Sequence, residues 1–149
     1  MESFKSALGR YDVLSIVLHW SIAIFIVGLF TSGLWMVTLG YYDDWYYRAP
    51  WWHMGFGVIT VVLVIARLIW TLCRTPIKRI RTIPVWQYLA AKCVHELMNM
   101  ATIVIVISGY LMVTIKGDGL NVFDWFTIPA LFTAESTWSD TAGLIHLWT

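Results

Sequence analysis

The stretch WWHMGFGVITVVLVIARLIWTL, residues Trp51 to Leu72, decides the fold class of this chain. Its ionisable side chains are His53 near the start and Arg67 near the end. An apolar run of about 20 residues is long enough to cross a bilayer as a helix. Ionisable groups inside such a span are costly, so by default they face a partner inside the protein rather than lipid. The stretch therefore predicts a membrane helix with one polar group towards each end.

His53 and Arg67 lie on about the same face of this predicted helix. They are separated by 14 positions, which return to within about 40° of the same direction and rise roughly 21 Å. One helix face therefore carries a histidine near one side of the membrane and an arginine near the other. This pattern favours a buried partner with an apolar centre and acidic edges.

The composition places the whole chain in the membrane class. Of its 149 residues, 59% are hydrophobic and 13% are charged, whereas soluble domains carry about 25% charged residues. A net charge of +1 argues against nucleic-acid binding. The two cysteines, Cys73 and Cys93, have neither the spacing of a zinc site nor that of covalent cofactor attachment.

Two more apolar runs and the beginning of another complete the predicted organisation. We expect spans at about 13–39, 51–72 and 89–115 and the start of a fourth at about 143, all within one domain of residues 1–149. The fold class is therefore all-α, a transmembrane four-helix bundle. The aromatic segment Val122–Phe132 is predicted to lie on the membrane interface.

The basic side chains set the predicted orientation. They concentrate in the connector between the second and third spans, while the other two connectors are acidic. The positive-inside rule then places this connector and the N-terminus in the cytoplasm. His19 and His95 would lie near the cytoplasmic face, and His53 and His146 near the periplasmic face.

All four histidines fall within the spans or at their edges, at two predicted depths. A single histidine in a membrane helix is more often a hydrogen-bond partner than a ligand. Two imidazoles at one depth on different helices can, however, hold a metal from opposite sides, as the axial ligands of haem iron do. Since all four histidines sort in this way, we favour the cofactor interpretation.

Two glycines and Arg67 fit that interpretation, but each has an alternative. Gly33 follows His19 by 14 residues, and Gly109 follows His95 by the same distance, so each glycine would allow close approach on its histidine's face. Membrane helix interfaces are enriched in glycine in any case. Arg67 either snorkels to the headgroups or pairs with a carboxylate such as a haem propionate.

Taken in order, these residues resemble the bacterial cytochrome b561 family of di-haem membrane cytochromes. The matching pieces cover nearly the whole chain: Arg10-Tyr11, Val17-Leu18-His19-Trp20, Gly33-Leu34-Trp35-Met36, Ala49-Pro50, His53, Val64-Ile65-Ala66-Arg67-Leu68-Ile69-Trp70, His95, Ser108-Gly109-Tyr110-Leu111 and Gly143-Leu144-Ile145-His146-Leu147-Trp148. The resemblance implies a four-helix bundle with two non-covalent b haems. It rests on the order and spacing of these pieces rather than on one strong motif.

The resemblance also implies the ligand set. His53 and His146 would be axial ligands of the periplasmic-side haem, and His19 would bind the cytoplasmic-side haem. The family's second ligand of that haem lies about four turns further along the fourth helix, beyond Thr149. We therefore expect that most of the fourth helix is missing from a truncated sequence. If it is absent from the protein, only His95 or another subunit could replace this ligand.

The favoured function is electron transfer in the bacterial inner membrane, with exchange of electrons with the quinone pool. The expected partners are membrane lipid, quinone or quinol, and either a second copy of the chain or a peripheral oxidoreductase subunit. One alternative is a membrane anchor or cytochrome subunit of a larger oxidoreductase, which the acidic aromatic connectors would suit. Another is a small transporter whose histidines relay protons or metal ions.

Overall fold

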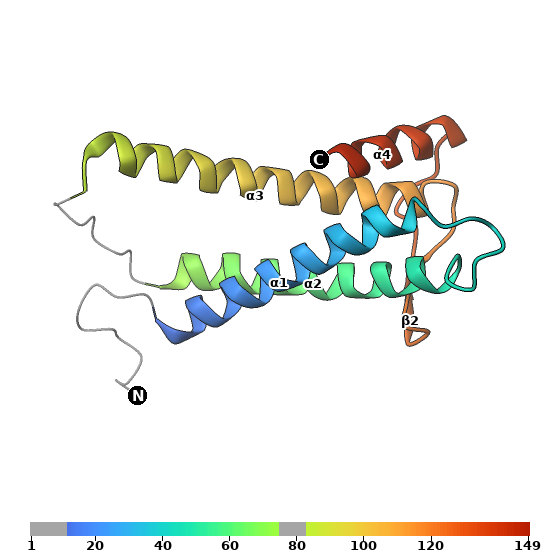
Figure 1. Cartoon of the computed structure of the whole chain (residues 1–149), viewed down its shortest axis with the longest axis horizontal. Helices are drawn as coiled ribbons and strands as arrows, with labels where there is room; N and C mark the ends of the chain where they lie inside the picture. Colours follow the sequence, from blue (N-terminus) through green and yellow to red (C-terminus); the bar gives the residue numbers. More distant parts are fainter. Residues whose placement is uncertain (1–11, 75–82) are drawn as a thin grey trace. The chain divides into compact units, whose positions relative to one another are not determined.

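The computed structural model describes residues 12–74 and 83–149, which form four helices and two short strands (Figure 1). The chain divides into two compact units, Met1–Ile80 and Arg81–Thr149, which are described separately below. The basic connector falls largely outside the described residues. The single domain that the sequence predicts stays a prediction.

The first unit is an antiparallel helix pair. Helix α1 spans Val13–Met36 and α2 spans Arg48–Cys73, and the two lie side by side. Asp12 caps α1, because its carboxylate accepts a hydrogen bond of 2.6 Å from the Ser15 amide. The Trp70 indole donates to the same carboxylate at 3.1 Å. One acid therefore fixes the start of α1 against the end of α2.

The second unit combines two helices with a hairpin. Helix α3 spans Val85–Thr114, strands β1 (Leu120–Val122) and β2 (Phe126–Ile128) pair antiparallel, and α4 spans Ser136–Trp148. Gly117 has a φ of 101° just after α3, a conformation that glycine adopts readily. Helix α4 folds back along the C-terminal part of α3 (Figure 1).

The fourth helix begins earlier than the sequence predicts, at Ser136 rather than at about Gly143. Its first turns are polar and so lack the apolar run that marks a membrane span. They are helical because they pack on α3: Ser139 is buried and donates a hydrogen bond of 2.8 Å to the Met112 carbonyl. The hairpin of β1 and β2, which overlaps the segment Val122–Phe132, is likewise not predicted by the sequence.

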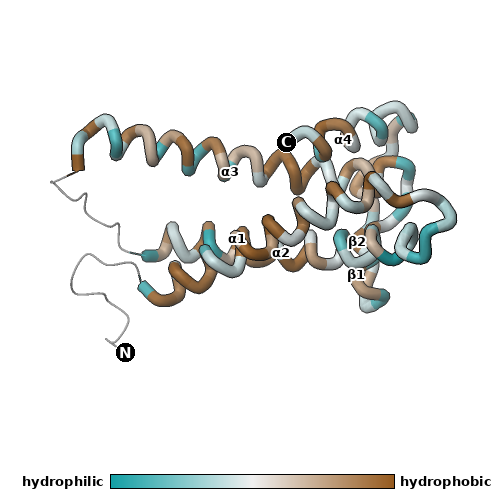
Figure 2. The backbone as a smooth tube through the Cα atoms, in the orientation of Figure 1, coloured by the Kyte–Doolittle hydropathy of each residue, from teal (hydrophilic) through white to brown (hydrophobic). Residues whose placement is uncertain are grey.

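The helices have the surface of a membrane protein. Helices α1, α2 and α3 are long and apolar enough to cross a bilayer. Hydrophobic residues run along most of α1 and α2, whereas hydrophilic residues interrupt the first half of α3 (Figure 2). Many large apolar side chains are exposed. Apart from Ile22 of α1, the buried helix residues are small or hydroxylated, among them Ala49, Gly55, Thr60, Ser108 and Ala142. Small residues at helix contacts are typical of membrane helices, so the predicted all-α transmembrane class is confirmed.

Candidate functional site

His53 lies on α2 against α1, and a serine of α1 holds its ring. The Nδ1 atom of His53 is 3.0 Å from the Ser32 hydroxyl oxygen. Ser32 itself donates a hydrogen bond of 2.9 Å to the Leu29 carbonyl. Because a carbonyl can only accept, a Ser32 hydroxyl that donates to Leu29 accepts from Nδ1–H of His53. This arrangement puts the proton of the neutral imidazole on Nδ1 and the lone pair on Nε2.

His146 is held in a similar way on α4 against α3. Its Nδ1 atom is 2.9 Å from the backbone carbonyl of Ile105 and 3.5 Å from the hydroxyl of Ser108. The Ser108 hydroxyl donates to the carbonyls of Val104, at 2.7 Å, and Ile105, at 3.1 Å. The carbonyl of Ile105 is an acceptor, so Nδ1 of His146 carries the proton. Here too Nε2 is the nitrogen with the lone pair.

A glycine adjoins each of these rings. A Cβ atom on Gly33 would lie 3.5 Å from Cε1 of His53, an ordinary contact. A Cβ atom on Gly109 would lie only 2.7 Å from Cε1 and 2.9 Å from Nδ1 of His146. The His146 ring therefore occupies space that only a glycine leaves open.

The two units thus repeat one local arrangement. In each, a histidine packs on a Ser-Gly pair of the neighbouring helix, Ser32-Gly33 for His53 and Ser108-Gly109 for His146. The sequence pointed to the glycines but not to the serines. The repeated Ser-Gly pair is the signal that could have identified them.

The other predicted site residues lie elsewhere in each unit. His19 is exposed on α1. Its ring centroid lies 5.9 Å from that of Trp20, in an edge-on arrangement. His19 precedes Gly33 by 14 residues, and Arg67 follows His53 by 14 on the antiparallel α2. Both therefore lie about 21 Å from the His53–Gly33 contact, at one level of the first unit. Arg67 is half-buried.

His95 occupies a corresponding place in the second unit. It is exposed on α3 and precedes Gly109 by 14 residues, about 21 Å from the contact with His146. Across residues 12–74 and 83–149, no group of three or more His, Cys, Asp or Glu side chains is arranged to hold a metal ion.

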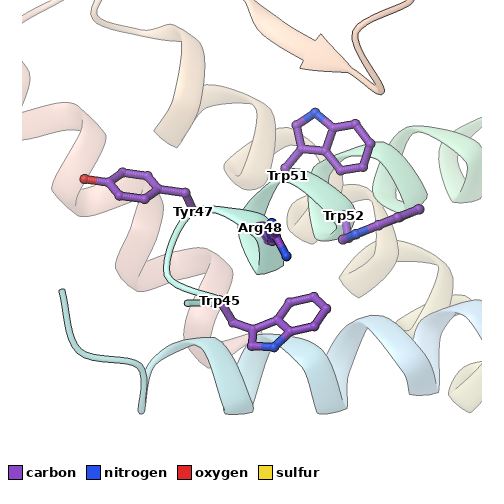
Figure 3. Close-up of a pocket in the computed structure, with 5 residues that line it drawn as sticks. All are labelled: Trp45, Tyr47, Arg48, Trp51 and Trp52. Atoms are coloured by element: carbon purple, nitrogen blue, oxygen red, sulfur yellow. The ribbon is translucent and has the colours of Figure 1, made fainter. Parts of the chain in front are cut away.

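An aromatic pocket lies at the start of α2, beside the turn that bears His53. It has a volume of about 430 Å³ and is lined by Trp45, Tyr47, Arg48, Trp51 and Trp52. The guanidinium of Arg48 lies among the indole rings (Figure 3). This volume is within the usual range of small-molecule sites. The sequence assigned these aromatics to the membrane interface, and nothing in their order indicates a hollow among them.

Comparisons with known proteins agree over almost the whole chain. The family described as prokaryotic cytochrome b561 matches residues 10–149. Cytochrome b561 homolog 2 of Escherichia coli (strain K12) is 37% identical over 146 residues, which cover 98% of this chain and 78% of that protein. No solved structure matches the chain.

Proposed function

The chain belongs to the prokaryotic cytochrome b561 family, and we propose that it binds b haem by bis-histidine ligation through His53 and His146. As a member, it is a multi-pass bacterial membrane protein and a b-type cytochrome of electron transfer. When bound, haem supplies the one-electron redox chemistry, while the protein sets the position and environment of the iron. The family was correctly identified from the sequence.

The observation that carries the ligand assignment is the hydrogen-bond partner at Nδ1 of each imidazole. A histidine that binds metal through one ring nitrogen usually donates the hydrogen of the other to a carbonyl, carboxylate or water. Nδ1 of His146 has the Ile105 carbonyl at 2.9 Å, and Nδ1 of His53 has the Ser32 hydroxyl at 3.0 Å. Both rings therefore fit the requirements of an axial ligand that binds through Nε2.

We assign a second haem to the opposite level, with His19 as one ligand and Arg67 as the partner of a propionate. His19 and Arg67 share that level of the first unit, about 21 Å from His53. Arg67 is half-buried and follows apolar residues in the sequence, and its guanidinium could bind a carboxylate through two hydrogen bonds. His95 is the candidate for the second ligand within this chain. The basic connector supports a cytoplasmic position for this level by the positive-inside rule.

The aromatic pocket supports exchange of electrons with quinol. Indole and phenol rings provide flat surfaces against which a quinone ring can stack, and Arg48 can donate hydrogen bonds to its oxygens. The pocket includes Trp51 and Trp52, which directly precede His53 in α2. Bound quinone would therefore lie close to the proposed periplasmic-side haem.

Haem content per chain tests the ligand assignment. In His53→Ala and His146→Ala we expect the same haem to be lost, whereas His19→Ala should remove the other one. Reduced-minus-oxidised spectra with pigment quantified per chain provide the measurement. Unchanged spectra in both the His53 and the His146 variants would refute the assignment.

Quinol oxidation tests the role of the pocket separately. Loss of the charged donor in Arg48→Gln should slow haem reduction by quinol about tenfold, equivalent to about 1.4 kcal/mol, with the dithionite-reduced spectrum unchanged. Lys92→Gln, which neutralises an exposed cation on α3, is the matched control. Equal rates in the two variants would exclude the pocket as the quinol site.

A further inference from the structure

We propose that Ser32 is a positioning residue that selects Nε2 of His53 as the nitrogen available to iron. This inference rests on the proposed function, in which His53 is an axial ligand. Its basis is the chain of hydrogen bonds from Nδ1–H of His53 to the Ser32 oxygen, at 3.0 Å, and from the Ser32 hydroxyl to the Leu29 carbonyl, at 2.9 Å.

The direction of this chain decides which ring nitrogen can bind metal. With the Ser32 hydrogen directed to Leu29, the serine oxygen can only accept, so the imidazole proton stays on Nδ1. If the hydroxyl turned and donated to Nδ1, the ring proton would have to move to Nε2, which could then no longer bind iron. The Leu29 carbonyl therefore orients Ser32, and Ser32 fixes the tautomer of His53.

For His146, the tautomer is fixed by a backbone carbonyl rather than by a side chain. Nδ1 of His146 is 2.9 Å from the Ile105 carbonyl but 3.5 Å from the Ser108 hydroxyl. A donor–acceptor distance of 3.5 Å lies outside the usual range of hydrogen bonds, so the carbonyl dominates. Removal of the Ser108 hydroxyl would leave this acceptor in place. The two histidines therefore differ in whether a serine substitution can disturb them.

The hydrogen bond at Nδ1 also influences how strongly the imidazole donates electrons to iron through Nε2. A partner that accepts from Nδ1–H raises the basicity of the imidazole. A more basic ligand stabilises the oxidised iron, which carries the greater positive charge, and so lowers the midpoint potential. Loss of the Ser32 acceptor should thus raise the potential of the His53-ligated haem and weaken its binding about tenfold, the lower end for loss of such a partner.

The test compares four variants of the full-length haem-loaded protein. Ser32→Ala removes the acceptor, and Ser32→Thr retains a hydroxyl. Thr31→Ala removes a neighbouring exposed hydroxyl that donates to the carbonyls of Val27 and Gly28 in its own helix. Ser108→Ala makes the same chemical change beside His146. The readouts are haem retention against apomyoglobin, a haem-scavenging protein, and the midpoint potential of each haem by redox titration.

We expect Ser32→Ala to weaken haem retention about tenfold and raise one midpoint potential, with recovery in Ser32→Thr. Thr31→Ala should change neither quantity, and Ser108→Ala should change them less than Ser32→Ala does. A Ser32→Ala protein with the retention and potential of Thr31→Ala would overturn the proposal. So would a Ser108→Ala protein that changes as much as Ser32→Ala. If His53→Ala kept both haems, the assignment of His53 as a ligand would fail. That result is distinguishable from the two outcomes that would overturn only the role of Ser32.

Discussion

The His146 imidazole fills the position that a side chain on Gly109 would occupy, with Cε1 only 2.7 Å from the site of the missing Cβ. Real Cβ atoms essentially never approach this closely, so the ring would have to move if residue 109 were alanine. The ring is held at the same time by the Ile105 carbonyl at 2.9 Å. A shift away from α3 therefore lengthens that hydrogen bond. The close contact and the orientation of His146 are thus one structural feature.

Gly109→Ala should disturb the His146 site, whereas Gly33→Ala should not disturb the His53 site. Overpacking of this kind costs about 1–3 kcal/mol, which would reduce haem binding at His146 by about fivefold to about 150-fold. A methyl on Gly33 would meet His53 at an ordinary 3.5 Å. Because alanine favours the helix more than glycine does, the substitution at Gly33 would also stabilise α1 by up to about 1 kcal/mol. Haem content of the purified variants measures both effects, and equal haem content in both would contradict the close packing at Gly109.

Ser139→Ala should weaken the attachment of α4 to α3. Met112 is among the last four residues of α3, whose carbonyls lack partners further along the helix. The buried Ser139 hydroxyl donates to the Met112 carbonyl at 2.8 Å. Its loss should cost about 1 kcal/mol and lower the midpoint of thermal unfolding by about 2–4 °C.

Thr141→Ala is the matched control for Ser139. Its hydroxyl is exposed and donates to Thr137 in the same helix. We expect its unfolding midpoint to match that of the unsubstituted protein. If Thr141→Ala were destabilised as much as Ser139→Ala, the contact between the helices would not be the cause.

Tyr110→Phe should loosen the connector between the hairpin and α4. The Tyr110 hydroxyl donates to the Pro129 carbonyl at 2.7 Å and accepts from the Leu131 amide at 3.0 Å. Without it, the Leu131 amide should exchange its hydrogen about tenfold faster, corresponding to a loss of about 1.4 kcal/mol. Hydrogen-exchange mass spectrometry gives the measurement. Tyr42→Phe, at a residue 97% exposed, should leave this peptide unchanged, and protection retained in Tyr110→Phe would argue against the bridge.

The sequence predicts the spans well but not the contacts between them. Long apolar runs identify α1, α2 and α3, because burial in lipid requires about 20 apolar residues regardless of the neighbours. The start of α4 at Ser136 has no such signal, because its polar turns are stabilised by packing on α3. The hairpin is short and is likewise marked by no apolar run.

In the candidate site, too, the sequence predicts features within one helix but not the contacts between helices. Histidines at two predicted depths and glycines 14 residues away could be identified from spacing, because helix geometry fixes both. The hydrogen bonds of Ser32 and Ile105 could not, because they depend on the rotation of one helix against another. The ligation of haem by His19, His53 and His146, and the roles of Arg67 and His95, stay predictions.

Acid should remove the contribution of Asp12 to the helix pair. The hydrogen bond from the Ser15 amide is the main cause that lowers the pKa of Asp12 below its usual value of 3.8. The Trp70 indole and the charge of Arg74 lower it further, while burial opposes them. A carboxyl whose pKa is lower in the folded state stabilises that state above the unfolded pKa. This contribution is therefore complete above about pH 5 and is lost as the pH falls through 3.8 towards the folded pKa.

Asp12→Asn separates this charge effect from helix capping, because asparagine also caps helices well. We expect the variant to unfold more easily than the unsubstituted protein at neutral pH, with the difference shrinking below the unfolded pKa of 3.8. The measurement is denaturant unfolding in detergent across this pH range. The fluorescence of Trp70 monitors unfolding in a protein background in which Trp70 is the only tryptophan. Asp44→Asn, which changes an exposed acid in the connector before α2, is the control. A destabilisation of Asp12→Asn that persists unchanged below the folded pKa would mean that the ionised carboxylate does not hold α1 to α2, and that the contact with Trp70 depends on packing alone.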